Sequence, residues 1–554
     1  MKYTVIELSG TYRETGVMVS GLTAANTGKQ FRMDRLVEKV DTLLGGSSVQ
    51  TVILHRKEDF SCPSLAGIEA IRRLVMRLRG DDRTVLYYSI GYTLDDLYLA
   101  SACNRRIAHP QGTVSFLGRS VSHLYFAKFL NRQSIEVDVI RHGRYKSAMN
   151  RFIRDSVDRF DREQIERLLH VMVARVRTLT SSDMLISDAT IDALLEGQVL
   201  TTAECVERGW IERLDDFEGV EEEFRQKKRT RAARDKKLRG KTGHSGPRVS
   251  VMFFEGAIDH GENRRSPLFG QIIGSDWYVR RLRAIRKDKK TQAVVLRVNS
   301  PGGSATASED IRRELDRLKE KKPVIVSMGS VAASGGYWIS MAAHRIFAQK
   351  FTITGSIGVI AALINLNDFL KKNGITSSVI KQGDHADLGS ALRKMSVEER
   401  RIFEQTTSRI YGDFVRLVAD SRGLSEQDVI DMAEGRIWSG EDAVQNGLID
   451  EIGDLRDAVD YAATRLGVSS VQVRFGPTVK RPFVARLLQG HSGKTEEAAP
   501  FPDTGVLLGI GETLRTGLSP SLSALYGLKG LQQDLYTLNA KPMALYPGPL
   551  LHPE

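Results

Sequence analysis

Apolar residues are grouped along this chain in short continuous runs, most clearly at 249–254, 293–298 and 323–328. The runs are rich in β-branched residues and do not alternate strictly with polar positions, which is typical of strands buried on both faces of a parallel sheet. Between the second and third runs, Ile311, Leu315 and Leu318 follow helical spacing and predict a helix over 308–318. Strand, helix and strand in this order predict a right-handed βαβ unit.

The same pattern occurs earlier in the chain, where the runs 51–54 and 84–88 flank a helical segment at 71–78. Ile71-Arg72-Arg73 recurs as Ile311-Arg312-Arg313, and residues 102–107 and 209–212 resemble 341–346 and 447–450. The offsets of these three matches are 240, 239 and 238 residues. Because the register hardly drifts over such a length, the sequence predicts two tandem copies of one α/β domain.

Composition narrows the classes of protein that fit. The 554 residues are 41% hydrophobic and 27% charged, as in an ordinary soluble globular chain. The formal net charge is +12, but segment 225–241 holds ten Lys or Arg residues against one acid. The net charge of all the other residues together is therefore only +3. A nucleic-acid-binding protein is therefore disfavoured. The three cysteines have neither disulfide nor metal-ligand spacing, so neither kind of site is predicted.

Four segments are predicted from these features: a first copy at 1–221, a basic linker at 222–247, a second copy at 248–470 and a tail at 471–554. The linker combines a charge block with Gly, Ser and Pro, and is either solvated or in contact with anionic lipid or a partner. Nine of the 15 prolines lie in 477–554. The tail is therefore expected to be partly disordered or to wrap around a neighbour.

No membrane-spanning segment or signal peptide is predicted. The first 32 residues carry six charged side chains, and the longest apolar run, at 357–364, has about eight residues where a span needs about 20.

A serine stands where the third predicted strand meets a helix, in the sequence Ser334-Gly335-Gly336. This arrangement resembles a nucleophile elbow, in which the N–H of Gly335 would lie near the carbonyl that the serine attacks. The alternative is a helix-capping serine followed by glycines that allow close packing. In the first copy Asp95 takes the place of Ser334, so only the second copy could supply a serine nucleophile.

Gly302 and Gly303 directly follow the second predicted strand of this copy. Backbone N–H groups there would face the crevice at the carboxyl end of the strands, where parallel sheets bind ligands. A simple turn is the alternative.

A serine nucleophile needs a base. His344 and His385 are the histidines near these segments, and the third candidate is Lys146 of the first copy, whose counterpart in the second copy is Ala386. A lone lysine before a helix is usually a solvated side chain. One copy nevertheless has the serine without the lysine, and the other has the lysine without the serine.

Five segments together resemble one known family: 143–148, 296–304, 333–340, 354–358 and 435–440. They are similar to the long form of the signal peptide peptidase A family (protease IV), whose members are tandem duplications in the crotonase and Clp protease superfamily. The likeness covers roughly residues 50–465.

The resemblance implies two crotonase-like copies of the ββα-spiral type and a serine endopeptidase with a Ser/Lys dyad. Ser334 would be the nucleophile, Lys146 the general base, and Ser356 the residue that orients the lysine. Backbone amides of Gly335 and Gly303 would form the oxyanion hole. No metal, nucleotide or other cofactor is implied.

The resemblance also implies partners and a location. Family members are bacterial homotetramers that degrade released signal peptides and other apolar peptides. Those of this length usually begin with a membrane-anchoring helix, and no such helix is predicted from this sequence. The protein is therefore expected to bind the membrane peripherally through 225–241, to act in the cytoplasm, or to start upstream of Met1.

Two other functions share the predicted fold. A crotonase-type acyl-thioester enzyme would need an acid/base carboxylate and has no evident use for Ser334 or Lys146. A non-catalytic scaffold would be expected to have lost one member of the pair.

Overall fold

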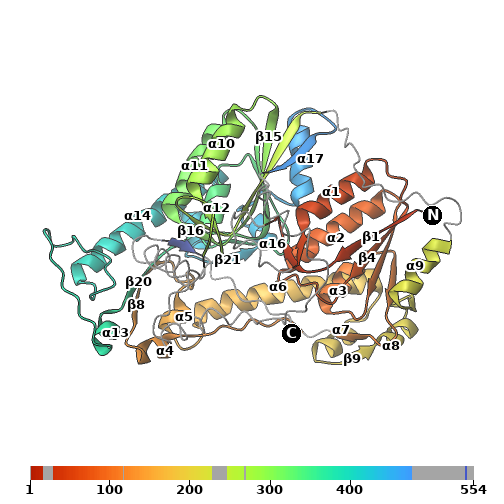
Figure 1. Ribbon diagram of the computed structural model, residues 1–554, viewed down its shortest axis with the longest axis horizontal. Helices are drawn as coiled ribbons and strands as arrows, with labels where there is room; N and C mark the ends of the chain where they lie inside the picture. Colours follow the sequence, from red (N-terminus) through yellow and green to blue (C-terminus); the bar gives the residue numbers. More distant parts are fainter. Residues whose placement is uncertain are drawn as a thin grey trace, which may run out of the picture.

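A computed structural model describes residues 2–16, 29–115, 118–226, 246–266, 270–476 and 543–545 (Figure 1). Strands and helices are mixed along the chain, and the predicted α/β class is confirmed. The elements up to residue 226 are β1 (Tyr3–Leu8), β2 (Thr11–Arg13), β3 (Gln30–Arg32), α1 (Met33–Leu44), β4 (Thr51–Arg56), α2 (Leu65–Gly80), β5 (Thr84–Ser89), α3 (Leu94–Ala100), β6 (Arg105–Ala108), β7 (Thr113–Ser115), α4 (Ala127–Arg132), β8 (Glu136–His142), α5 (Asn150–Ile153), α6 (Arg159–Met184), α7 (Asp188–Leu195), β9 (Val199–Thr201), α8 (Thr202–Glu207), β10 (Arg213–Leu214) and α9 (Phe217–Gln226).

The elements after residue 246 are β11 (Arg248–Glu255), β12 (Ala257–Asp259), β13 (Arg264–Ser266), β14 (Gly270–Gly274), α10 (Ser275–Lys287), β15 (Thr291–Ser300), β16 (Gly302–Ser304), α11 (Ala305–Lys319), β17 (Val324–Ala333), α12 (Gly335–Ser340), β18 (Arg345–Ala348), β19 (Ile353–Gly355), β20 (Val359–Asn365), α13 (Asn367–Lys372), α14 (Val397–Arg422), α15 (Glu426–Met432), β21 (Ile437–Ser439), α16 (Gly440–Gln445), β22 (Glu451–Ile452), α17 (Leu455–Arg465), β23 (Gln472–Gly476) and β24 (Met543–Leu545).

The same order of parallel strands occurs twice. In the first copy the order is β1-β4-β5-β6-β10, with every neighbouring pair parallel. In the second copy β11, β15, β17, β18 and β22 pair in the corresponding parallel order, and β23 adds a strand beside β11. Equivalent strands in equivalent order confirm the predicted tandem duplication.

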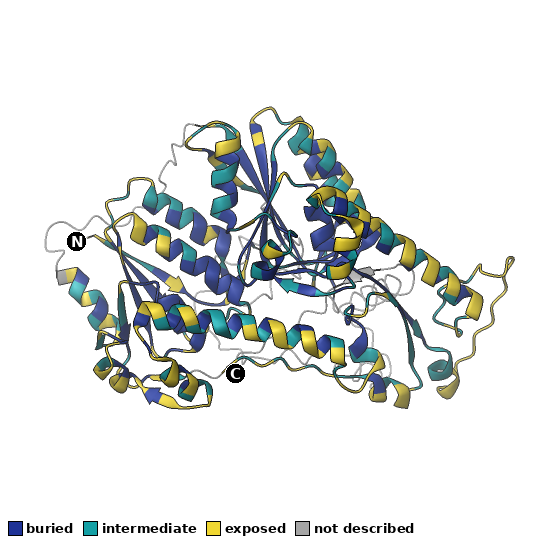
Figure 2. Cartoon of the chain, turned by 180° about the vertical axis from the view of Figure 1, so that it is seen from behind, coloured by how far each residue is buried: buried dark blue, intermediate teal, exposed yellow. Residues whose placement is uncertain are grey.

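The apolar runs of the sequence form the centres of these sheets. In β15, eight of the ten residues are buried, all except Gln292 and Asn299. Figure 2 shows the buried strands enclosed by helices whose outer faces are exposed. The helix predicted at 308–318 is α11, and the one predicted at 71–78 lies within α2. Burial on both faces explains why the sequences of these strands are continuous runs of apolar residues.

The domain boundaries differ slightly from those predicted. The linker was expected to begin at residue 222, but helix α9 continues to Gln226. Residues 227–245, which include most of the basic segment, lie outside the described residues. Strand β23 lies just inside the predicted tail, yet it pairs with β11 and belongs to the second copy's sheet. Of the rest of the tail, 543–545 are described.

A third sheet contains strands from both copies, in the order β13-β14-β12-β16-β24-β20-β8. Strand β8 of the first copy pairs antiparallel with β20 of the second over seven residues. In Figure 1, β8 lies with α4 and α5 across the second copy from the parallel sheet of the first. The first copy thus reaches around the second instead of standing beside it.

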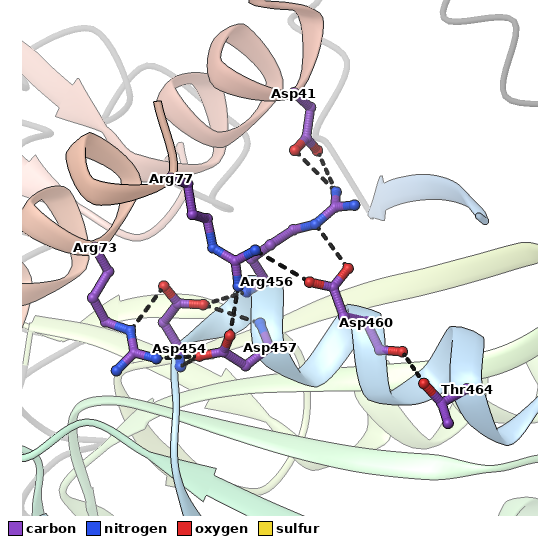
Figure 3. A network of polar contacts seen from close by, with 8 residues as sticks. All are labelled: Asp41, Arg73, Arg77, Asp454, Arg456, Asp457, Asp460 and Thr464. Atoms are coloured by element: carbon purple, nitrogen blue, oxygen red, sulfur yellow. Dashed lines mark hydrogen bonds and ion pairs between the residues drawn. The ribbon is translucent and has the colours of Figure 1, made fainter. Parts of the chain in front are cut away.

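Ion pairs join the two copies where helices α1 and α2 face α17 (Figure 3). Arg73 and Arg77 on α2 both bond to Asp457. In the opposite sense, Arg456 on α17 donates to both carboxylate oxygens of Asp41 on α1, each at 2.9 Å. These side chains are partly exposed, so salt screens their attraction.

A second ion pair between the copies is completely buried. Arg297 on β15 and Glu14, which follows β2, are each 1% exposed. The guanidinium donates to both carboxylate oxygens, at 3.0 and 2.8 Å, and its remaining nitrogen donates to Ser327 Oγ and the Met328 carbonyl. Removing one partner of such a pair leaves an uncompensated buried charge.

Candidate active site

Ser334 occupies a sharp turn between strand β17 and helix α12. Its backbone angles are φ 56° and ψ −118°, a conformation that residues other than glycine rarely adopt. The Ser334 N–H donates to the Gly355 carbonyl at 2.8 Å, which fixes the turn against β19. Its side chain makes no capping hydrogen bond to α12. The strand-to-helix turn predicted from the sequence is confirmed, and the hydroxyl does not act as a helix cap.

The glycines after Ser334 allow α12 to pack closely on its neighbours. A Cβ atom on Gly335 would lie 2.6 Å from Ser308 Oγ, and one on Gly336 would lie 2.6 Å from the Ser300 carbonyl oxygen. The same Cβ on Gly335 would lie 3.1 Å from the backbone nitrogen of Gly303. The two glycines predicted to donate to an oxyanion are therefore neighbours in the structure.

Lys146 reaches Ser334 from the first copy. Its Nζ lies 2.7 Å from Ser334 Oγ, 2.8 Å from the Ser356 carbonyl oxygen and 3.0 Å from Ser356 Oγ. Ser334 is 0% exposed, and Lys146 and Ser356 are each 1% exposed. The three side chains that the sequence singled out, from segments up to 210 residues apart, thus meet in one buried cluster.

Ser356 also has an unusual backbone, with φ 53°. Its N–H donates to the Arg436 carbonyl at 2.7 Å, which holds the residue between β19 and β20. Both of its oxygens face the lysine amine. A positive φ at two non-glycine residues of one buried cluster is strain of the kind that functional sites store.

Two glycines let the loop that carries Lys146 lie against the segment 434–436. A Cβ on Gly435 would lie 2.7 Å from both the nitrogen and the Cβ of Lys146, and one on Gly143 would lie 2.4 Å from the Glu434 carbonyl carbon. The Tyr145 N–H donates to the Glu434 carbonyl at 2.9 Å. The motif 435–440, for which the sequence suggested no role, supports both Lys146 and Ser356.

Polar residues of helix α6 hold this loop from its other side, and sequence reasoning missed them. Asp161 accepts a hydrogen bond from Ser147 Oγ at 2.7 Å. Gln164 donates to the Tyr145 carbonyl and accepts from the Ile437 N–H, linking the loop to β21. Both residues are buried and begin the stripe of buried positions that continues down α6. Polar side chains at core positions of an amphipathic helix were the available signal.

Burial lowers the pKa of Lys146 well below its ordinary value of 10.5. Desolvation disfavours the ammonium form, and no acidic side chain in the described part of the chain offsets it. Among the residues that the structure describes, Lys146 forms no ion pair.

The histidines weighed as bases lie elsewhere. His344 accepts a hydrogen bond from the Val324 N–H at 3.1 Å, and His385 lies 3.8 Å from Glu399. Within the described part of the chain, neither histidine contacts Ser334.

Two kinds of feature are absent from the described ranges. No group of three or more His, Cys, Asp or Glu side chains is placed there to hold a metal ion. None of the helices described is both long and apolar enough to cross a membrane.

Comparison with known proteins gives a consistent set of matches. A family model described as Peptidase family S49 matches residues 86–231 and 316–469, one region in each copy. Protease 4 of Salmonella typhi is 32% identical over 433 residues, covering 75% of this chain and 69% of that protein. Protease 4 of Haemophilus influenzae is 30% identical, covering 73% and 68%. The chloroplastic serine protease SPPA of Arabidopsis thaliana is 31% identical, covering 72% and 61%. The two bacterial relatives support the predicted bacterial origin.

Proposed function

From the premise that the chain belongs to peptidase family S49 and is a serine peptidase, we propose that Ser334 and Lys146 form its catalytic dyad. The observation that carries this proposal is the buried 2.7 Å contact between Lys146 Nζ and Ser334 Oγ. The strained turn at Ser334 supports it, because such a turn presents a nucleophile at the carboxyl end of a parallel sheet.

The lysine can accept a proton only as a free amine. With an ordinary pKa, about one molecule in 2,500 would carry that form at pH 7. Burial favours the neutral amine, which has one lone pair and two N–H groups. The lone pair would accept the Ser334 hydroxyl proton, and the two N–H groups would donate to the carbonyl and hydroxyl of Ser356. Ser356 is then a positioning residue.

The reaction is acyl transfer. Ser334 Oγ attacks the peptide carbonyl while Lys146 takes its proton, and the backbone N–H groups of Gly335 and Gly303 stabilise the oxyanion. Lys146 then protonates the departing amine. Water hydrolyses the resulting ester with the lysine again as base, which frees the serine.

As substrates we propose apolar peptides such as released signal peptides. The resemblance of the motifs at 296–304 and 333–340 to the signal peptide peptidase A family supports this choice. The test compares kcat/KM for an apolar signal-peptide sequence and for a charged peptide of equal length. We expect at least about a tenfold preference for the apolar peptide, since each methylene in an apolar pocket contributes about 1 kcal/mol. An equal rate for both peptides would contradict the proposed substrate class.

We also propose that copies of the chain form a tetramer and that the basic segment 225–241 contacts anionic lipid. The family resemblance supports the tetramer, and the ten basic residues of the segment support the lipid contact.

Vesicle binding should weaken steeply with salt, at about 1 kcal/mol per engaged charge. Replacing four of the basic residues by Gln should abolish binding and leave hydrolysis of a soluble peptide unchanged. Analytical ultracentrifugation tests the tetramer.

The dyad itself is tested with Ser334→Ala, Lys146→Ala and the double variant. Each single change should lower kcat/KM by at least about 10⁴-fold, and the double variant should be no worse, because the two residues act as one unit. Lys321→Ala, at an exposed lysine, is the matched control and should keep full activity. A fluorophosphonate probe should label the wild type but not Ser334→Ala. Near-full activity of Lys146→Ala at pH 7 would refute the dyad.

A further inference from the structure

One arginine connects the segments that carry Lys146, Ser356 and Ser334. Arg436 is the residue before strand β21, which lies beside helix α6 of the first copy in Figure 1. Its backbone carbonyl accepts the Ser356 N–H at 2.7 Å. The main chain of Arg436 is therefore bonded directly to the residue whose two oxygens face the lysine amine.

The side chain of Arg436 extends to the first copy. Its guanidinium carbon lies 4.9 Å from the centre of the Tyr145 ring, and Tyr145 directly precedes Lys146. Its Nη2 lies 3.0 Å from a carboxylate oxygen of Glu163 on α6. The Tyr145 hydroxyl donates to the same carboxylate at 3.1 Å. Arginine, tyrosine and glutamate thus contact one another pairwise, which fixes the residue next to the lysine.

A second aromatic ring contacts the same guanidinium and leads to the nucleophile. The centre of the Trp438 ring lies 4.8 Å from the guanidinium carbon of Arg436. Trp438 packs against Gly355, where a Cβ atom would lie 2.9 Å from the Cδ1 atom of the tryptophan ring. The Gly355 carbonyl in turn accepts the Ser334 N–H at 2.8 Å. The Arg436 side chain therefore lies two contacts away from Ser334 and one residue away from Lys146.

We propose that Arg436 is a positioning residue of the reaction and sets the distance between the Lys146 amine and the Ser334 hydroxyl. Its guanidinium holds Tyr145 of the first copy and Trp438 of the second on one planar group. The loops that carry the two halves of the dyad therefore cannot move independently. The inference rests on the proposed dyad, and Arg436 acts through its neighbours instead of on the reacting atoms.

The contacts of Arg436 suit a guanidinium and not an ammonium group. A guanidinium is flat, stacks on aromatic rings and binds a carboxylate in its own plane, whereas the lysine ammonium is compact and strongly hydrated. The side chains of Arg436 and Glu163 are 22% and 44% exposed, so their ion pair adds little to the stability of the fold. Its effect on the reaction is larger, because a displacement of about 1 Å at reacting atoms can cost about 100-fold in rate.

Steady-state kinetics with a soluble peptide substrate test the proposal first. In Arg436→Ala, kcat should fall about 100-fold and KM should change less than about twofold, because the alignment of the lysine is lost and not the binding of the peptide. Arg436→Lys keeps the charge without the flat group, and its kcat should lie between those of Arg436→Ala and the wild type. The matched control is Arg345→Ala, since Arg345 also pairs with a glutamate, Glu451 at 3.0 Å, and lies 5.6 Å from a tyrosine ring, that of Tyr461. Its kcat should be unchanged.

Guanidinium ion in solution can replace the missing group. Because the Arg436 side chain is partly exposed, a small ion can reach the place that Arg436→Ala leaves vacant. Guanidinium chloride at about 50 mM, far below the concentrations that unfold proteins, should raise the kcat of Arg436→Ala at least about tenfold. Urea, which is flat but uncharged, and sodium chloride at the same concentration should leave it unchanged. Equal recovery with urea or sodium chloride would overturn the role of the guanidinium group.

The pH profile distinguishes positioning of the lysine from a general loss of structure. Burial lowers the pKa of Lys146, and the charged groups beside its loop are paired, Arg144 with Glu434 and Arg436 with Glu163. A loop that is no longer held at Tyr145 admits water, so the pKa of the lysine should rise toward its ordinary value. The limb of kcat/KM that increases with pH should therefore move to higher pH in Arg436→Ala, and its activity relative to the wild type should be lower at pH 7 than at pH 9.5. An unfolded fraction of the protein would not move this limb.

A second variant covers the case in which Arg436→Ala does not fold. Glu163→Ala removes the carboxylate partner from an exposed position, and it should lower kcat about three- to tenfold with KM unchanged. Wild-type kcat in both variants, or a reduced kcat with an unshifted pH profile, would overturn the positioning role.

The proposed dyad is judged separately, by Lys146→Ala. An inactive Lys146→Ala beside a fully active Arg436→Ala would refute the role of Arg436 and leave the dyad standing. Full activity of Lys146→Ala would refute the dyad, and the positioning role of Arg436 with it.

Discussion

If Lys146 is neutral in the folded enzyme, the free energy of unfolding depends on pH through the titration of this lysine. The side chain is 1% exposed and bonds only to Ser334 and Ser356 among the described residues. Burial lowers its pKa well below 10.5, the ordinary value that it regains on unfolding. Between these two pKa values, the unfolded chain holds a proton that the folded chain has lost.

The direction of this pH dependence follows from proton linkage. Because the unfolded state binds more protons in this interval, the free energy of unfolding rises with pH, by about 1.4 kcal/mol per pH unit. The burial of Lys146 destabilises the folded chain by its full amount at pH values below the pKa of the lysine in the folded state. This destabilisation disappears as the pH approaches 10.5. Lys146→Met fills similar space without a titrating group. The variant should therefore be more stable than its parent at neutral pH, and its advantage should shrink by about 1.4 kcal/mol for each unit of pH.

The assay is urea denaturation at pH 7.5, 8.5 and 9.5. All chains carry Ser334→Ala, so that unfolded molecules are not digested. The parent is compared with chains that also carry Lys146→Met or, as control, Lys321→Met at an exposed position. The difference in unfolding free energy should fall with pH for Lys146→Met and stay constant for Lys321→Met. Identical pH profiles for parent and Lys146→Met would mean that the folded enzyme keeps this proton, and the lysine could not act as the base.

Three further outcomes follow from the same geometry. Ser356→Ala should lower kcat by about 10- to 100-fold with little change in KM, because one of the two acceptors that orient the lysine is lost. Ser356→Thr should recover part of the rate. An unchanged kcat in Ser356→Ala would exclude a positioning role. Glu14→Ala should cost about 3–5 kcal/mol in urea unfolding by stranding the Arg297 guanidinium, and a loss under 1 kcal/mol would contradict its burial. Residues 1–240 and 241–554 should each be inactive and recover activity when mixed at low salt, whereas full activity of 241–554 alone would refute the division of the dyad.

The elements that carry Ser334 could be predicted from the sequence for a physical reason. Strands buried on both faces of a parallel sheet need apolar residues at every position, so β11, β15 and β17 are continuous apolar runs. Duplication then supplied an internal comparison, in which Asp95 replaces Ser334 and Ala386 replaces Lys146. That asymmetry, together with the family resemblance, pointed to residues that the structure brings within hydrogen-bonding distance.

Other parts of the site were harder to predict from local sequence patterns. Glu14 and Arg297 pair across 283 positions, and Glu14 belongs to no motif. Gln164 reaches the lysine loop from a helix whose spacing predicts only an amphipathic surface. Strand β24 has three residues, too few for any periodicity, and its place is fixed by the two strands beside it. Contacts between distant segments depend on the assembled sheet, which local propensity does not encode.

A proton transfer shared between two domains requires that the domains keep a fixed relative position. A displacement of about 1 Å at reacting atoms can cost about 100-fold in rate, so the covalent connection between the copies could not by itself keep Lys146 Nζ at 2.7 Å from Ser334 Oγ. Three contacts between the copies meet this need: the β8–β20 pairing beside the lysine, the buried pair of Arg297 and Glu14, and the ion pairs of α2 with α17. Once such an interface exists, each copy needs only its own half of the dyad. The Asp95 and Ala386 substitutions are then tolerated, because the missing group is always supplied by the other half of the same chain.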